Sequence, residues 1–348
     1  MICKNIEIHN AGDLIYNEDG SVSWRRVPTE VFNEMEMRNA PNTVHGVSGV
    51  ELRFVIKGES VKIKMSQVSE NPASMTTMHV FRGGIQSGWE DHEVNRIVTG
   101  EVKEFEFKRA ENIERLNDMS KKAGYDWDSE VVRVILYGGR IKLYDVIGDV
   151  EPPKKSQTPS KTMLCYGSSI TNMSNSLDAS NAWVAKVAHN LNVDFINKGM
   201  AGSCAMEPAM ANYIASEGEK GNWDFATLEL GINVLGWEVE KFRERADNII
   251  YQVATRNQDK QIFVISPFYH CGDEYWDDDN AKIYRVVLKE IVEKYNFKNV
   301  TYVNGFEILD KSLYMSGDFI HPNIYGVQKI AQDMTKIISE KLNLKVIK

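Results

Sequence analysis

"MLCYGSSITN", residues 163–172, joins a short apolar run to a glycine and two adjacent serines. An apolar run of this length that ends in glycine is typical of a buried strand followed by a sharp turn. In open α/β sheets, ligands bind beyond the carboxyl ends of such strands. The stretch therefore predicts a site at this turn, and it leaves open whether Ser168 or Ser169 does the chemistry.

Downstream of this stretch, short apolar runs alternate with amphipathic helical patterns. Further strands are predicted in VDFIN (193–197), FATLELG (225–231) and QIFVISPF (261–268), and helices in AWVAKVAHNLN (182–192), VEKFRERADNIIYQVATR (239–256), NAKIYRVVLKEIVEKY (280–295) and NIYGVQKIAQDMTKIISEKL (323–342). Such alternation predicts an α/β domain over residues 162–348, with a parallel sheet covered by helices on both faces.

The first 150 residues follow a different pattern, that of an antiparallel β-sandwich. Short runs rich in Val, Ile and aromatic residues are separated by turns, in VELRFVIKG (50–58), SVKIKMS (60–66), TMHVFRGG (77–84), EVKEFEFK (101–108) and VVRVILYGGRIKLYDV (131–146). A helix is predicted over 111–124, where an apolar stripe ends in glycine. The polar, proline-rich segment 151–161 reads as the linker between the two domains.

Composition and charge narrow the function classes. The 348 residues carry 41 Lys and Arg against 49 Asp and Glu, a net charge of −8 without a basic block, which argues against nucleic-acid and membrane partners. The first ten residues lack the pattern of a secretion signal, so we expect a cytoplasmic protein. The four cysteines have no zinc-site spacing, and we expect neither a metal nor a cofactor. The sequence leaves the oligomeric state open.

Four loops that follow predicted strands carry polar or glycine residues beyond what packing requires. They are GSS (167–169), NKGMAGSC (197–204), LGINVLGW (230–237) and GDFIHPN (317–323). Taken singly, each loop is explained equally well as a turn with a purely structural role. Together, on one edge of one sheet, they supply a hydroxyl nucleophile, a histidine base, a carboxylate to orient it and neutral donors for an oxyanion.

The residue types and spacings suggest roles within this set. Asp318 precedes His321 by three residues, so both side chains fall on one side of a tight turn, with the second imidazole nitrogen free to face a serine. Asn233 can offer its side-chain N–H₂ group and Gly202 its backbone N–H group to a developing oxyanion. The pattern therefore predicts acyl transfer through a serine.

The four blocks resemble those of the SGNH (GDSL-type) hydrolase family over residues 162–342. YGSSIT looks like its Gly-Asp-Ser-Ile-Thr block, NKGMAG like Asn-x-Gly-x-x-Gly, LGINV like Gly-x-Asn-Asp and DFIHPN like Asp-x-x-His-Pro. The resemblance implies a flavodoxin-like three-layer α/β/α fold. It implies that Ser169 is the nucleophile, His321 the base and Asp318 its partner, and that the oxyanion hole is formed by Ser169, Gly202 and Asn233.

Two positions depart from the family pattern: Ser168 and Val234 stand where aspartates are usual. Neither position supplies the nucleophile, the base or an oxyanion donor in the family, so we expect altered loop hydrogen bonding without loss of chemistry. A jelly-roll-like β-sandwich before the hydrolase domain is similar to the layout of two-domain carbohydrate esterases. The SPFYH loop (266–270) is reminiscent of acetyl-xylan esterases.

Aromatic side chains near the strand-end loops are candidates for a substrate pocket. They are Trp237, Tyr269 and Trp276. Two other readings are less favoured. Cys204 as a nucleophile lacks a second histidine motif, and the loop HCGDEYWDDDN (270–280) lacks the ligand spacing of a cation site.

The favoured hypothesis is a metal-independent serine esterase. It would remove a short acyl group, with acetyl the first choice, from a carbohydrate or another small polar ester through an acyl-enzyme. An acyl hydrolase of longer chains, of the lysophospholipase or thioesterase type, remains an alternative. An inactive carbohydrate-binding protein is a further alternative that the complete set of catalytic residues disfavours.

Overall fold

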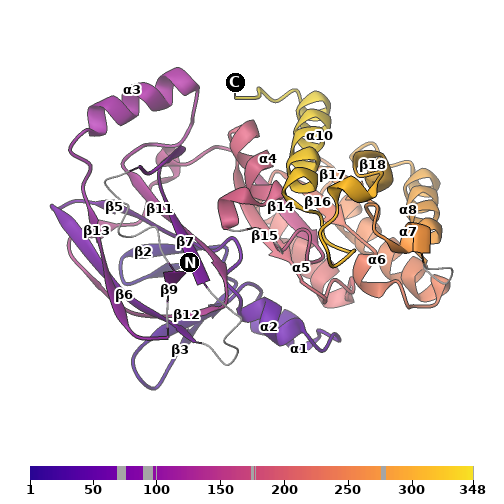
Figure 1. The fold of residues 1–348 in the computed structure, drawn as a ribbon, viewed down its shortest axis with the longest axis horizontal. Helices are drawn as coiled ribbons and strands as arrows, with labels where there is room; N and C mark the ends of the chain where they lie inside the picture. The colour runs from indigo at the N-terminus through magenta and orange to yellow at the C-terminus, as the bar shows by residue number, and fades with distance from the viewer. Residues whose placement is uncertain are drawn as a thin grey trace.

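The computed structural model describes residues 1–68, 76–88, 97–98, 100–173, 176, 178–275 and 280–347. Figure 1 shows two domains side by side, an N-terminal one made mostly of strands and a C-terminal one in which helices surround a sheet. Residues 152–161 join them, with a single 3₁₀ turn at Lys155–Gln157. Within the described ranges, every helix is too short or too polar to span a bilayer.

The N-terminal domain is a sandwich of two antiparallel sheets. Its strands are Ile2–Cys3 (β1), Ile6–His9 (β2), Asp13–Tyr16 (β3), Val22–Arg25 (β4), Glu51–Ile56 (β5), Ser60–Val68 (β6), Thr76–Arg82 (β7), Ile85–Gln86 (β8), Ile97–Val98 (β9), Lys103–Lys108 (β10), Val131–Gly138 (β11), Arg140–Ile147 (β12) and Val150–Glu151 (β13). One sheet has the order β1-β2-β5-β11-β7-β8, with β13 beside β5 and β9 beside β7, and the other has the order β10-β6-β12-β4-β3. Apolar residues on the inner faces, among them Phe54, Phe107 and Leu143, form the core, which confirms the predicted sandwich.

In the described part of the sandwich, three helices lie between the strands. The predicted one is present as Ile113–Ala123 (α3) and ends at Gly124, whose φ of 81° closes the helix in a left-handed conformation. Two short helices, Thr29–Asn33 (α1) and Ala40–His45 (α2), were not predicted, because neither is long enough to show a helical period. Their apolar side chains, including Val31 and Val44, pack into the core of the C-terminal domain.

The C-terminal domain is a parallel sheet between two helical layers. Its strands are Thr162–Gly167 (β14), Asp194–Gly199 (β15), Phe225–Glu229 (β16), Gln261–Ile265 (β17) and Val300–Val303 (β18), and its helices are Trp183–Leu191 (α4), Pro208–Glu219 (α5), Val239–Arg256 (α6), Gly272–Tyr275 (α7), Ala281–Tyr295 (α8), Gly305–Ile308 (α9) and Ile324–Leu342 (α10). Helices α5, α6 and α8 cover one face, and α4 and α10 cover the other. The strand order β15-β14-β16-β17-β18 confirms the expected flavodoxin-like fold.

The two domains meet along the free edge of β15, the outer strand of the parallel sheet. Alternate carbonyl groups on this edge point away from β14 and need other partners. His9 Nε2 donates to the Phe195 carbonyl at 2.8 Å. The Asn197 carbonyl accepts from Asn10 Nδ2 at 2.9 Å and from Arg26 Nη1 at 3.1 Å. Side chains of the sandwich thus take the place of a further strand.

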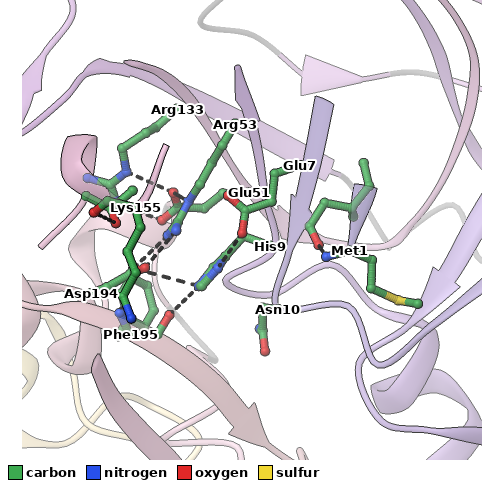
Figure 2. A network of polar contacts seen from close by, with 12 residues as sticks. Met1, Glu7, His9, Asn10, Glu51, Arg53, Arg133, Lys155, Asp194 and Phe195 are labelled. Atoms are coloured by element: carbon green, nitrogen blue, oxygen red, sulfur yellow. Dashed lines mark hydrogen bonds and ion pairs between the residues drawn. The ribbon is translucent and has the colours of Figure 1, made fainter. Parts of the chain in front are cut away.

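A buried network of charges lies at one end of this interface (Figure 2). The two terminal nitrogens of Arg53 each donate to one oxygen of Asp194 at 2.7 Å. Arg53 Nε and Arg133 Nη2 donate to the two oxygens of Glu51, also at 2.7 Å, and both guanidinium groups lie against the Trp127 ring. Although burial opposes ionisation, the Arg53 guanidinium holds the pKa of Asp194 below its usual range.

Replacement of Arg53 by Met would leave two buried carboxylates short of a cation. We expect Arg53→Met to lower the free energy of unfolding in urea by about 3–5 kcal/mol, since an uncompensated buried charge is costly. Lys62→Met is the matched control, because it breaks the exposed pair with Glu104 at 2.8 Å and should leave stability unchanged. Equal effects of the two substitutions would show that the buried network does not hold the domains together.

Candidate active site

Ser169 lies on the turn that follows β14. Gly167 at the end of this strand has no room for a side chain, because a Cβ atom there would lie 2.4 Å from Thr171 Oγ1. The turn presents the Ser169 hydroxyl to His321, with Oγ and Nε2 2.7 Å apart. The structure therefore brings together a serine and a histidine that are separated by 152 positions in the chain.

Ser168 faces the opposite way, into the protein. Its hydroxyl donates to Glu229 Oε2 at 2.7 Å and accepts from the Ile170 N–H group at 3.1 Å, and the residue is fully buried. Its backbone N–H group also donates to Glu229 Oε2 at 2.7 Å. Ser168 is thus an anchor of the turn and cannot reach His321.

Asp318 and His321 form one compact turn, as their spacing predicts. Asp318 Oδ2 lies 2.7 Å from His321 Nδ1, while Oδ1 accepts from the backbone N–H groups of Ile320 and His321 and from the Ser316 hydroxyl. Partial burial opposes ionisation, but these hydrogen bonds outweigh it and lower the pKa of Asp318. The carboxylate is therefore ionised at neutral pH and can only accept.

This geometry assigns the protons of the imidazole. Because the Asp318 carboxylate only accepts, His321 Nδ1 carries the hydrogen that it shares with Asp318. In the neutral ring, Nε2 is then unprotonated and accepts from the Ser169 hydroxyl. The arrangement is that of a serine nucleophile with a general base held in the productive tautomer.

Three donors on adjacent strand-end loops are available to an oxyanion. Asn233 Oδ1 accepts from the Cys204 N–H group at 3.1 Å, which leaves the Asn233 N–H₂ group to point away from that contact. Among the described residues, none accepts a hydrogen bond from the backbone N–H group of Ser169 or Gly202. The loops are tied together, since the Met200 N–H group donates to the Gly167 carbonyl at 2.7 Å. These are the three predicted oxyanion donors.

The structure describes two of the three predicted pocket residues. Trp237 is partly buried, with Lys241 Nζ 4.0 Å from its ring centroid, and remains a candidate for the rim. Tyr269 is only 2 % exposed and packs in the apolar cluster that also contains side chains of α10, and its part in a substrate pocket stays a prediction. Trp276 lies outside the described residues.

Cys204 is buried, and burial raises its pKa well above the ordinary value, which fits a packed thiol.

Glu229 is a component of the site that the sequence did not reveal. It ends β16 and is fully buried beneath the nucleophile turn, where Thr171 Oγ1 also donates to Oε2 at 3.1 Å. An aspartate at position 168 would set a second carboxylate against it, so Ser168 suits a chain that has Glu229.

Val234, at the other departure from the family pattern, is buried in the apolar core, where an aspartate would be costly.

In the described residues, no group of three His, Cys, Asp or Glu side chains is placed to hold a metal ion. In the loop 270–280, the described part pairs His270 and Arg285 with Asp273, at 3.3 and 2.5 Å. Asp273 therefore joins His270 of this loop to Arg285 of α8.

Comparison with known proteins identifies this domain. Residues 165–329 match the model of the GDSL-like lipase/acylhydrolase family. The C-terminal domain belongs to this family. The match supports an acyl-ester hydrolase, in agreement with the contacts of Asp318, His321 and Ser169. A search of curated proteins finds no significant match.

Similar solved structures extend over both domains. A salicylyl-acyltransferase from a tetracycline biosynthetic pathway matches with a TM-score of 0.76 and 17% identity over 99% of this chain and 96% of the other. A putative GDSL-like lipase from Bacteroides ovatus matches with 0.67 and 18% over 93% of each chain. A family two carbohydrate esterase from Cellvibrio japonicus matches with 0.62 and 11% over 98% and 96%. At these identities the likeness concerns the fold, including the sandwich.

The two adjacent serines should respond differently to substitution. We expect Ser169→Ala to reduce ester turnover by about four to six orders of magnitude, because the nucleophile is lost. Ser168→Ala should keep turnover within about tenfold and instead lower stability by roughly 1–3 kcal/mol, since it removes a buried hydrogen bond to Glu229. Initial rates on a chromogenic acetate ester and urea unfolding measure both. Full turnover by Ser169→Ala would exclude the mechanism.

Glu229 should make stability fall as the pH rises. Burial raises its pKa from 4.5 to about 7, although hydrogen bonds from Ser168 and Thr171 oppose the rise. Between these values the native state holds a proton that the unfolded chain has released, so the stabilisation is complete below pH 4.5 and is lost as the pH passes 7. Relative to Glu229→Gln, wild type should lose up to about 3 kcal/mol across this window in urea unfolding. A constant difference between the two proteins would contradict the raised pKa.

Proposed function

We propose that the protein is a serine esterase that removes a short acyl group, acetyl, from a carbohydrate or another small polar ester. The observation that carries this proposal is the continuous chain of contacts from Asp318 through His321 to Ser169, with both links at 2.7 Å. The family match of the domain and the similar fold of a carbohydrate esterase support the class of substrate.

The reaction follows from the proton positions. Ser169 Oγ attacks the ester carbonyl carbon while its proton passes to His321 Nε2, and the negative charge on the carbonyl oxygen is stabilised by the three donors of the oxyanion hole. Collapse of this intermediate breaks the ester bond, and the leaving alcohol takes the proton from His321. Water then gives a proton to His321 and attacks the acyl-enzyme, which releases the acid and returns the proton to Ser169.

A neutral ester substrate is compatible with the net negative charge of the protein. With a net charge of −8, the protein has no overall attraction for an acidic polymer, and a neutral ester is the more suitable substrate. We further propose a cytoplasmic location, where the ester would be a small imported or internal metabolite. Neither a nucleic acid nor a membrane is part of this proposal.

Transfer of the acyl group to an alcohol is the second candidate. It is favoured by the salicylyl-acyltransferase, whose TM-score is higher than that of the carbohydrate esterase. The two reactions share the acyl-enzyme and differ only in the acceptor that enters after the first alcohol leaves. Products of a reaction run with a sugar or polyol acceptor separate them, because hydrolysis yields free acid and transfer yields a new ester.

Acyl-chain length tests the proposed substrate class. We expect kcat/KM on p-nitrophenyl esters to be highest for acetate and to fall towards octanoate. Exposed apolar side chains flank the histidine in sequence, with Phe319 57 % and Ile324 64 % exposed, and they are the surface that a longer chain could contact. Activity that rises with chain length would therefore overturn the acetyl assignment and favour the lysophospholipase or thioesterase type.

A further inference from the structure

The peptide unit between Ala201 and Gly202 connects the sandwich to the oxyanion hole. Its N–H group belongs to Gly202 and is one of the three oxyanion donors, while its carbonyl group belongs to Ala201. In a planar trans peptide these two groups point in opposite directions. Whatever holds the Ala201 carbonyl therefore also sets the direction of the Gly202 N–H group.

The groups that hold this carbonyl come from the other domain. Asn39 Nδ2 donates to the Ala201 carbonyl at 2.8 Å, and Thr43 Oγ1 donates to it at 3.0 Å. Asn39 stands at the residue before α2, and Thr43 lies on this helix and is buried. One acceptor on the catalytic domain thus takes two hydrogen bonds from one short helix of the sandwich.

The position needs such support because glycine permits rotation of the peptide. Gly202 has a φ of 62°, and a Cβ atom there would meet nothing closer than Asn39 Nδ2 at 3.6 Å. Glycine adopts positive and negative φ with similar ease, so sterics alone do not select one orientation. A rotated unit would place the Ala201 carbonyl where the N–H group now points, and its lone pairs would repel an oxyanion.

The same loop is held at a second carbonyl by the sandwich. Arg26 Nη2 donates to the Gly199 carbonyl at 2.8 Å and to Asn172 Oδ1, beyond the nucleophile turn, at 2.7 Å. Gly199 itself packs tightly, since a Cβ atom there would lie 2.3 Å from the Asn172 N atom. The start of the loop is therefore rigid, and the freedom to rotate is concentrated near Gly202.

We propose that α2 of the sandwich positions the oxyanion hole by holding the Ala201–Gly202 peptide through Asn39 and Thr43. The two side chains act through the Gly202 N–H group and are positioning residues. The inference rests on the proposed serine esterase mechanism. It gives the N-terminal domain a part in stabilising the transition state.

The test compares two Asn→Asp substitutions across the domain interface. Asn39→Asp removes the donor to Ala201 and sets a carboxylate against its carbonyl. Asn192→Asp is the matched control, because Asn192 Nδ2 also donates to a carbonyl of the other domain, that of Gly124, at 3.0 Å. Each asparagine also accepts a hydrogen bond through Oδ1, from Asn42 Nδ2 and from the Asp126 N–H group, and aspartate can keep that bond.

We expect Asn39→Asp and Thr43→Val to lower kcat on an acetate ester by about 10- to 100-fold with little change in KM, less than the 10²–10³-fold typical for deletion of an oxyanion donor. The affinity for a short alkylboronic acid, which forms a negatively charged tetrahedral adduct on the serine, should fall by a similar factor. Asn192→Asp should retain wild-type kcat, KM and boronate affinity.

The outcomes separate this inference from the proposed function. If wild type hydrolyses the ester and Ser169→Ala does not, but Asn39→Asp and Thr43→Val match Asn192→Asp in kcat and boronate affinity, the positioning role is overturned and the esterase remains. If wild type neither hydrolyses esters nor binds the boronic acid, the proposed function itself fails. A rise in KM without a change in kcat would contradict the positioning role. Equal decreases in kcat in all three variants would indicate general destabilisation and would also contradict it.

Discussion

The free edge of β15 is the constraint on which the two-domain arrangement depends. A parallel sheet leaves unpaired carbonyl groups along its outer strand, and these groups must find donors when the strand is buried. Here His9, Asn10 and Arg26 of the sandwich supply them. Strand β15 runs directly into the loop that carries Gly202. The contacts between the sandwich and the edge of β15 are therefore continuous with those that hold the Ala201–Gly202 peptide.

Buried polar groups explain why the interface is specific. A hydrophobic contact would tolerate small shifts between the domains, whereas paired charges and hydrogen-bonded carbonyls lose most of their stabilisation when they are displaced. Asp194 accepts hydrogen bonds from both terminal nitrogens of Arg53. These two bonds fix the orientation of the two side chains as well as the distance between them. The cost of burying these groups is thus offset only in one relative placement of the domains.

Within the catalytic domain, the parallel sheet assembles the site from distant segments. All strands end at the same edge, so the turns after β14, β15 and β16 meet there, and the loop before α10 adds the histidine. Glu229 supports this assembly from below, because it accepts from both the backbone and the side chain of Ser168. The nucleophile turn is therefore held by a carboxyl group on the neighbouring strand.

The sequence by itself determined the two fold classes and the four strand-end blocks, because periodicity and short spacings record local geometry. Asp318 and His321 were predictable for the same reason. The sequence did not distinguish Ser168 from Ser169 without a family resemblance, and it did not reveal Glu229, Arg26, Asn39 or Thr43. Polar residues look alike in sequence whether water or a carbonyl of another domain accepts their hydrogen bonds. Only the tertiary structure decided those partners, since they depend on how the path of the chain brings α2 against a loop more than 150 residues away.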